Sequence, residues 1–117
     1  MEISGSATLL RVFIGESDKI GHQPLYEAIV ERAREAGLAG ATVLKGVLGY
    51  GATARIRTAK ILDLSADLSM VVEIVDEAGK IDAFQHALSE LFDQADCGGL
   101  VTAEQVRVIR YLPERPA

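Results

Sequence analysis

The order of the predicted elements in this 117-residue chain indicates an α+β fold, a ferredoxin-like β-α-β-β-α-β sandwich. Three observations predict it. Four segments alternate between apolar and other residues, as strands do. Two segments repeat apolar residues at helical spacing, one after the first strand and one after the third. The third observation is the order of these segments, in which a loop of about 20 residues takes the place of the short hairpin that normally joins strands two and three. We therefore expect one antiparallel sheet with both helices on one face.

The first half of the chain contains two strands and one helix. The stretch TLLRVFIG (8–15) alternates as a strand. The following helix is expected to begin at Pro24, because the first turn of a helix leaves its N–H groups unbonded and proline has none. It is expected to end at Gly37, in a left-handed cap. The second strand is ATVLKGVLGY (41–50).

The second half repeats the same order of strand, helix and strand. The third strand is MVVEIVD (70–76), and the last is AEQVRVIRYL (103–112), which Pro113 ends. Between them lies a helix that Gly98-Gly99 follows. Its predicted buried stripe consists of Ile81, Phe84, Leu88, Leu91 and Phe92. We expect a single domain over residues 1–117, with its core between about 8 and 112.

Both faces of the predicted sheet are rich in apolar residues. The face expected to lie under the helices contains Leu10, Val12, Ile14, Leu44, Val72, Ile74, Val106 and Val108. The helix-free face contains Leu9, Phe13, Val43, Val47, Val71, Val75, Ile109 and Tyr111, with Arg11, Lys45, Glu73 and Arg107 among them. So wide an apolar face is unusual on a monomer, which predicts a homo-oligomer. Glu73 is expected to pair with one of the three cations.

Composition narrows the class of protein. The net charge of −5 and the few aromatic residues argue against nucleic-acid binding. A single cysteine favours a reduced, cytoplasmic protein. No apolar run is long enough to span a bilayer, and no signal peptide is evident, so we expect no membrane insertion.

The stretch GYGATARIRTAK (49–60) concentrates glycine and positive charge. No acidic residue occurs between Glu35 and Asp63. Glycine permits the backbone turns whose N–H groups meet an anion, and the cations would hold its charge. We therefore predict an anion site that comprises Gly49, Tyr50, Gly51, Arg55, Arg57 and Lys60.

Motifs of catalysis are missing. The sequence has no G-x-S-x-G, no Walker A motif and no C-x-x-C, so we expect no enzyme. The alternative is a small ferredoxin-like enzyme that uses Glu16, Asp18, His22 or Tyr26 as acid or base. The first three could also hold a metal, but their spacing is not diagnostic, and turn formation explains them, so no metal site is assigned.

Three stretches together resemble the family known as domain of unknown function 190, whose members are related to the PII nitrogen-signalling proteins. They are GESDKIGHQPLYEAIVERAREAGLAGATVLKGVLGYG, RTAKILDLSADLSMVVEIVD and KIDAFQHALSELFDQADCGGLVTAEQVRVIRY. The resemblance covers about residues 5 to 112. The segments PLYEAIV, GLAGATV, GYG and VVEIVD make it specific when taken together.

This resemblance implies a PII-like regulatory protein that forms a homotrimer with its three sheets packed inward. It implies an adenine nucleotide, such as ATP or ADP, in the clefts between subunits, and a long loop that carries the signal to a partner. Gly49–Gly51 match the start of that loop, and Arg107 and Arg110 lie where PII proteins place basic residues for the phosphates. Before the last strand the chain departs from PII proteins, because Gly98-Gly99 is followed by no lysine. The partner implied is a membrane transporter such as a fluoride channel.

Overall fold

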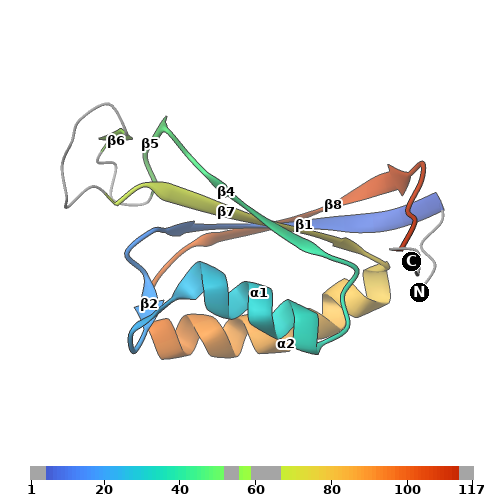
Figure 1. Cartoon of the computed structure of the whole chain (residues 1–117), viewed down its shortest axis with the longest axis horizontal. Helices are drawn as coiled ribbons and strands as arrows, with labels where there is room; N and C mark the ends of the chain where they lie inside the picture. The colour runs from blue at the N-terminus through green and yellow to red at the C-terminus, as the bar shows by residue number, and fades with distance from the viewer. Residues whose placement is uncertain (1–4, 52–55, 59–66, 114–117) are drawn as a thin grey trace, which may run out of the picture.

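The four main strands form one antiparallel sheet, and two helices cover one of its faces (Figure 1). The computed structural model describes residues 5–51, 56–58 and 67–113. The sheet order is β4-β7-β1-β8, which is the order of a ferredoxin-like fold. The strands are β1 (Gly5–Gly15), β4 (Ala41–Lys45), β7 (Ser69–Asp76) and β8 (Leu100–Val108), and the helices are α1 (Leu25–Glu35) and α2 (Ala78–Ala95). The predicted fold class is confirmed.

The core lies between the helices and the two central strands. Successive side chains of a strand point to opposite faces, so every second residue of β1 and β7 is buried under the helices. Leu10 pairs with Ile74 and Val12 with Val72 in the register of these strands, and all four are at most 1% exposed. The buried side chains that the two helices contribute to this core are Leu25, Ala28, Ile29, Ala33, Ile81, Phe84, Leu88 and Leu91. The predicted stripe of α2 is confirmed, with Phe92 only partly buried.

Both ends of α1 are explained by the residues found there. Pro24 is the N-cap, one residue before the helix, where its missing N–H costs no hydrogen bond. Gly37 has φ +76°, as predicted for a left-handed cap. The N–H groups of Gly37 and Leu38 donate to the carbonyls of Arg34 and Ala33, which closes the helix.

The last strand begins three residues earlier than predicted, at Leu100, and ends at Val108 instead of residue 112. Gly99 explains the early start. A Cβ at this position would lie 2.9 Å from the carbonyl oxygen of Phe13 and 2.8 Å from the Phe92 ring, so only glycine lets the chain enter the sheet here. Leu100 then pairs directly with Phe13.

This register reverses the predicted faces of β8. Val106 pairs with Ala7, and Val108 with Gly5, so both valines lie on the helix-free face. Arg107 pairs with Ser6 and therefore lies on the opposite side of the strand. The prediction was wrong because β8 is exposed along most of its length. Neither set of its alternate residues is fully buried, so apolar character does not mark the inner face of this strand.

The predicted faces of β4 are also reversed. Val43 pairs with Val72 and packs against the core, whereas Leu44 pairs with Val71 and is 48% exposed on the helix-free face. Lys45 lies on the helix side, where its Nζ is 2.6 Å from Oε2 of Glu16. Both faces of this edge strand are apolar, so alternation alone does not distinguish the inner face from the outer one.

The centre of the helix-free face contains the predicted ion pair. Nε of Arg11 donates to Oε2 of Glu73 at 2.8 Å, so the expected pairing of Glu73 is confirmed. A second carboxylate, that of Glu104 on β8, accepts from Nη1 of Arg11. These hydrogen bonds, that to Glu73 first, raise the pKa of Arg11.

Two short ribbons lie outside the main sheet. Strands β2 (Lys19–Ile20) and β3 (Gln23–Pro24) pair before α1, and β5 (Leu48–Gly49) pairs with β6 (Arg57–Thr58). Figure 1 shows β5 and β6 at one end of the sheet and the C-terminal end of β8 at the other. Within the described part of the chain, neither helix combines the length and apolar character needed to cross a bilayer.

Candidate functional site

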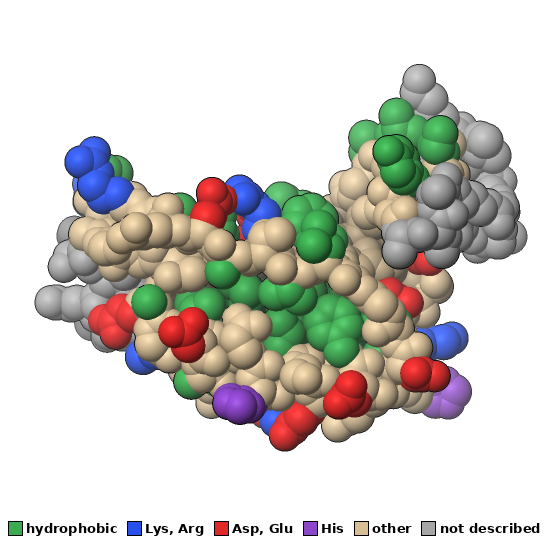
Figure 2. All heavy atoms as spheres, turned by 180° about the vertical axis from the view of Figure 1, so that it is seen from behind, with side chains coloured by type: hydrophobic (Ala, Val, Ile, Leu, Met, Phe, Trp, Pro, Cys, Tyr) green, Lys and Arg blue, Asp and Glu red, His purple; other side chains and the backbone are tan. Residues whose placement is uncertain are grey.

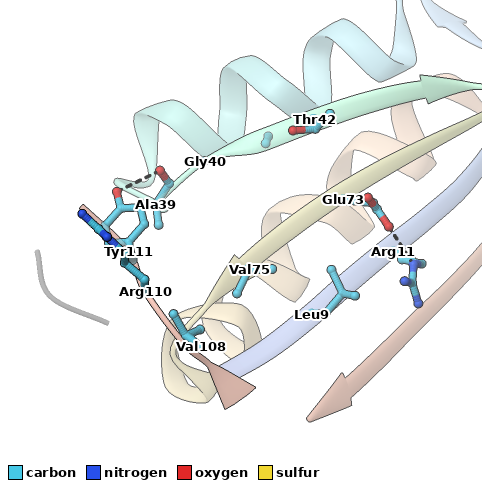
Figure 3. Close-up of a pocket in the computed structure, with 11 residues that line it drawn as sticks. Leu9, Arg11, Ala39, Gly40, Thr42, Glu73, Val75, Val108, Arg110 and Tyr111 are labelled. Carbon is cyan, nitrogen blue, oxygen red and sulfur yellow. Dashed lines mark hydrogen bonds and ion pairs between the residues drawn. The ribbon is translucent and has the colours of Figure 1, made fainter. Parts of the chain in front are cut away.

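A groove of about 610 Å³ opens on the helix-free face of the sheet (Figure 3). Its floor is formed by β1 and β7, one side by the start of β4, and the end by the segment that follows β8. The lining residues are Leu9, Arg11, Ala39, Gly40, Ala41, Thr42, Glu73, Val75, Val108, Arg110 and Tyr111. Its volume is within the range of small-molecule sites, about 300 to 1,000 Å³.

The floor of the groove combines an apolar strip with a paired charge. Leu9 and Val75 are direct neighbours across β1 and β7. Two residues further along the same strands, Arg11 and Glu73 pair with each other. Figure 3 shows these four side chains on one face, with Thr42 beyond them on β4. A flat apolar molecule could lie on the strip, with polar groups at one end.

The end wall is formed by two segments far apart in the sequence. After β8 the chain reaches across to the start of β4, where the Tyr111 hydroxyl donates to the carbonyl of Ala39 at 3.2 Å (Figure 3). Asp76 holds the same wall from beneath. This side chain is fully buried, and its Oδ2 accepts from the N–H of Ala39 at 2.9 Å, while Oδ1 accepts from Glu77 N–H at 2.7 Å. The wall is thus fixed on both sides.

Arg110 supplies positive charge at this end of the groove. Among the described residues it makes no hydrogen bond or ion pair, whereas Arg11 is already bonded to two carboxylates. An exposed guanidinium has five N–H donors in a fork that matches carboxylate and phosphate groups. The groove therefore combines an apolar floor with a cation at its end.

The structure separates the residues predicted to bind an anion. Gly49 is in β5, and exposed Tyr50 and Gly51 follow it, at the end of the sheet far from Arg110 (Figure 1). Only the backbone of Arg57 is described, and it pairs with Gly49. Arg55 and Lys60 lie outside the described residues. Arg107 is exposed on β8, on the face opposite the groove. Among those of the eight residues that the structure describes, only Arg110 lines the groove.

Sequence reasoning missed most of the groove. Ala39, Gly40 and Ala41 were noticed only as part of the motif GLAGATV, although small side chains in series are what leave room beside a sheet. Thr42 carried no signal of its own. Tyr111 was placed on the helix-free face, but its contact with a residue 72 positions earlier could not be read from the sequence.

Two of the candidate acids of the first loop, Glu16 and Asp18, make contacts that hold the loop in place. Glu16 pairs with Lys45, and Asp18 accepts from the N–H of Gly15 at 2.8 Å. His22 is exposed, and Tyr26 packs at the edge of the core. Within the described residues, no three His, Cys, Asp or Glu side chains are arranged to hold a metal ion.

Cys97 is expected to react slowly with thiol reagents. Burial, and then the nearby carboxylate of Asp18, raise its pKa from 9.0 to about 11. At pH 8 this reduces the thiolate fraction about 100-fold, and the gain in nucleophilicity offsets part of the loss. We expect disulfide exchange with Ellman's reagent to be about 10- to 50-fold slower in the native protein than in urea. Because Cys97 is the only cysteine, the absorbance reports this thiol alone. Equal rates would contradict the burial of the thiol.

The fold is shared with a known class of proteins. An antiparallel β4-β7-β1-β8 sheet with two helices on one face is the architecture of PII-like signalling proteins. One is CPII of Thiomonas intermedia, a nitrogen regulatory PII-like protein solved with ADP, AMP and bicarbonate, which superimposes with a TM-score of 0.66 at 14% identity over 90% of each chain. Another is a PII-like signalling protein of Thermus thermophilus, with a TM-score of 0.63 at 19% identity over 90% of this chain and 91% of that one.

The sequence comparisons narrow the class to one family. Residues 7–108 match the DUF190 family, described as "Uncharacterized ACR", and the chain belongs to it. A UPF0166 protein of Aquifex aeolicus is 44% identical over 101 residues, which cover 86% of this chain and 91% of the relative. A UPF0166 protein of Methanocaldococcus jannaschii is 29% identical over 104 residues, which cover 89% and 93%. The resemblance drawn from the sequence motifs is confirmed.

Proposed function

We propose that this protein is a PII-like regulator that binds a small anionic ligand, an adenine nucleotide, at clefts between subunits and changes a partner's activity through the long segment between β4 and β7. It would act by binding, without turnover. The proposal rests on the groove and on the segment Gly49–Gly51, which we call the glycine turn. They lie at opposite ends of one sheet, and the groove suits the base and sugar of a nucleotide while the glycine turn suits its phosphates.

The groove suits the base and sugar of a nucleotide. A purine is flat and largely apolar on its faces, and the strip of Leu9 and Val75 is a matching surface. Thr42 and the carboxylate of Glu73 are polar groups at its margin, of the kind that fix the orientation of a ligand. Arg110 would meet a negative charge at the groove's end.

The glycine turn suits the phosphates. Gly49 and Gly51 flank Tyr50, and the sequence that follows has cations and no acid before Asp63. In one subunit this turn is far from the groove, but a second copy could bring its own turn to the groove of the first. The apolar helix-free face supports such an assembly, because large apolar faces are normally covered. We propose a homotrimer, in keeping with the family resemblance.

An enzymatic role for the first loop is less well supported. Glu16 and Asp18 are engaged in the contacts that hold the loop, and His22 is exposed with no acid placed beside it among the described contacts. Acid–base chemistry requires two groups within hydrogen-bond reach of one substrate atom. We therefore favour a binding role, with a membrane transporter, such as a fluoride channel, as the proposed class of partner.

Calorimetry with ATP, ADP, AMP and inorganic phosphate at low salt tests the ligand. We expect an adenine nucleotide to bind without hydrolysis. Arg110→Ala, at the groove, and the double variant Arg55→Ala/Arg57→Ala, at the turn, should each weaken binding about tenfold, because each removes charge-assisted bonds. Arg34→Ala is the matched control, since Arg34 is an exposed arginine on α1.

Two results would contradict the proposal. The first is that no nucleotide binds the wild-type protein at millimolar concentration. The second is that Arg34→Ala weakens binding as much as Arg110→Ala, which would mean that general surface charge explains the affinity. Release of phosphate or pyrophosphate during the titration would favour the enzymatic alternative instead.

A further inference from the structure

Four large apolar side chains are exposed together at one end of the molecule. Val47, Leu48, Tyr50 and Ile56 lie on or beside the β5–β6 ribbon and are 71, 66, 70 and 65% exposed. We call these four residues the apolar tip. Figure 2 shows hydrophobic side chains gathered on the projection that this ribbon forms above the rest of the sheet. Such a cluster on a projecting segment is typical of an interaction surface.

The apolar tip has no role in the core or in the groove. None of its four side chains is part of the buried cluster, and none lines the groove. The chain that leads into it is tied to the main sheet through the backbone, where the N–H of Gly46 donates to the carbonyl of Ser69 at 2.7 Å. Packing within the described residues therefore gives no reason to keep four large apolar residues here, which favours a partner outside this chain.

The distribution of charge identifies the kind of partner. The stretch between Glu35 and Asp63 contains four basic residues and no acidic one. All 17 acidic residues and only 8 of the 12 basic ones lie outside that stretch, which leaves a net charge of −9 for the remainder. Lys45 is paired with Glu16, whereas Arg55 and Arg57 flank Ile56 in the sequence and Lys60 follows shortly after. The sequence around the tip is thus positive on an otherwise acidic protein, which favours a negative partner.

We propose that the apolar tip docks on an anionic phospholipid surface. Exposed aliphatic side chains and a tyrosine next to basic residues are the combination that binds at the membrane–water interface. The aliphatic groups would enter the headgroup region, the tyrosine ring would lie at its boundary, and the cations of the sequence would meet lipid phosphates. This contact is superficial and needs no membrane-spanning segment.

The net charge of −5 does not oppose this docking. Charges are screened over about 8 Å at physiological ionic strength. The molecule is 43 Å long, and the tip projects from one end of it (Figures 1 and 2). Most acidic side chains are therefore beyond the screening distance when the tip touches a surface. A homo-oligomer would strengthen the contact by avidity, and that step alone rests on the proposed function.

Vesicle flotation tests the proposal with the full chain. Phosphatidylcholine vesicles, with or without about 30% phosphatidylglycerol, are mixed with the protein at low salt. We expect at least about fivefold more protein on the anionic vesicles, and a loss of that excess at about 0.5 M NaCl. Val47→Ser/Leu48→Ser should reduce the excess about fivefold, since it removes two of the four apolar side chains. Ile109→Ser is the matched control, because Ile109 is 77% exposed but lies beyond β8.

The outcomes separate this proposal from its alternatives. Equal binding of the double variant and the wild type would overturn it, and so would equal binding to neutral and anionic vesicles. No flotation with either vesicle would also overturn it and would leave a protein as the occupant of the tip. Far-ultraviolet circular dichroism confirms that the variants are folded. Val47 and Leu48 neither line the groove nor belong to the predicted anion site, so a nucleotide titration of the double variant keeps this test distinct from the ligand proposal.

Discussion

Replacement of Asp76 by alanine is expected to destabilise the protein by about 3 kcal/mol, a loss of about 150-fold in the folding equilibrium. Asp76 is the one charged residue among the fully buried described side chains. It accepts from the N–H groups of Ala39 and Glu77, and so it joins the end of β7 to the segment before β4 and to the start of α2. Alanine would remove the acceptor of both part-buried N–H groups and leave a void at a fully buried position.

Thermal unfolding at a fixed protein concentration measures the effect. For a chain of this size, about 3 kcal/mol corresponds to a midpoint lower by about 10 to 15 °C. Asp76→Asn retains one acceptor oxygen and should lose about half as much. Glu77→Ala is the control, because its side chain is adjacent and exposed, and the hydrogen bond to Asp76 comes from its backbone N–H. A midpoint within about 2 °C of the wild type for Asp76→Ala would contradict this account.

The same variant bears on the groove. The bond from Ala39 to Asp76 fixes one side of the wall that Tyr111 contacts from the other side. Loosening the wall should weaken ligand binding in addition to lowering stability. Comparing Asp76→Asn with the wild type by calorimetry, well below either unfolding midpoint, separates the two effects.

Val71→Asp is expected to dissociate the proposed homotrimer. Val71 is on the helix-free face, between Phe13 on β1 and Leu44 on β4. A carboxylate buried against the same face of a second copy would be costly, because it would lose its hydration without a partner. Light scattering should give about 38 kDa for the wild type, three times 12.5 kDa, and close to 12.5 kDa for the variant.

Ala83→Asp is the matched control for this prediction. Ala83 is exposed on α2, so the same new charge is placed on the helical side of the molecule. It should leave the mass at the trimer value. A wild-type protein that is monomeric at micromolar concentration would remove the basis of the subunit clefts, and the groove would then have to bind its ligand within one chain.

The fold was predictable because burial is uneven along the chain. In β1 and β7 one face is at most 5% exposed from Leu10 to Ile14 and from Met70 to Ile74, and the other face is half-buried, so the alternation marks the strands clearly. The stripe of α2 was predictable for the same reason. β4 and β8 are the sheet edges, where helices cover less, and there the same rule assigned the wrong faces.

The candidate site was only partly predictable. Glycine and cations in GYGATARIRTAK predict an anion site, and the alternative for such a charge cluster is a solvated face. Nothing in that stretch says that Arg110 is at the far end of the sheet or that Tyr111 reaches Ala39. Such contacts depend on how the chain crosses the sheet after β8, and local sequence does not record that path.

The order of elements, the family and the acid-free basic segment can all be read from residue type and spacing, which are local properties. The folded chain was needed to show which face each edge strand presents and which side chains line the groove. It was also needed to show that four apolar residues are exposed on or beside the β5–β6 ribbon. The physical reason is that strand register and the packing of distant segments set these features, and both arise only when the whole chain is assembled.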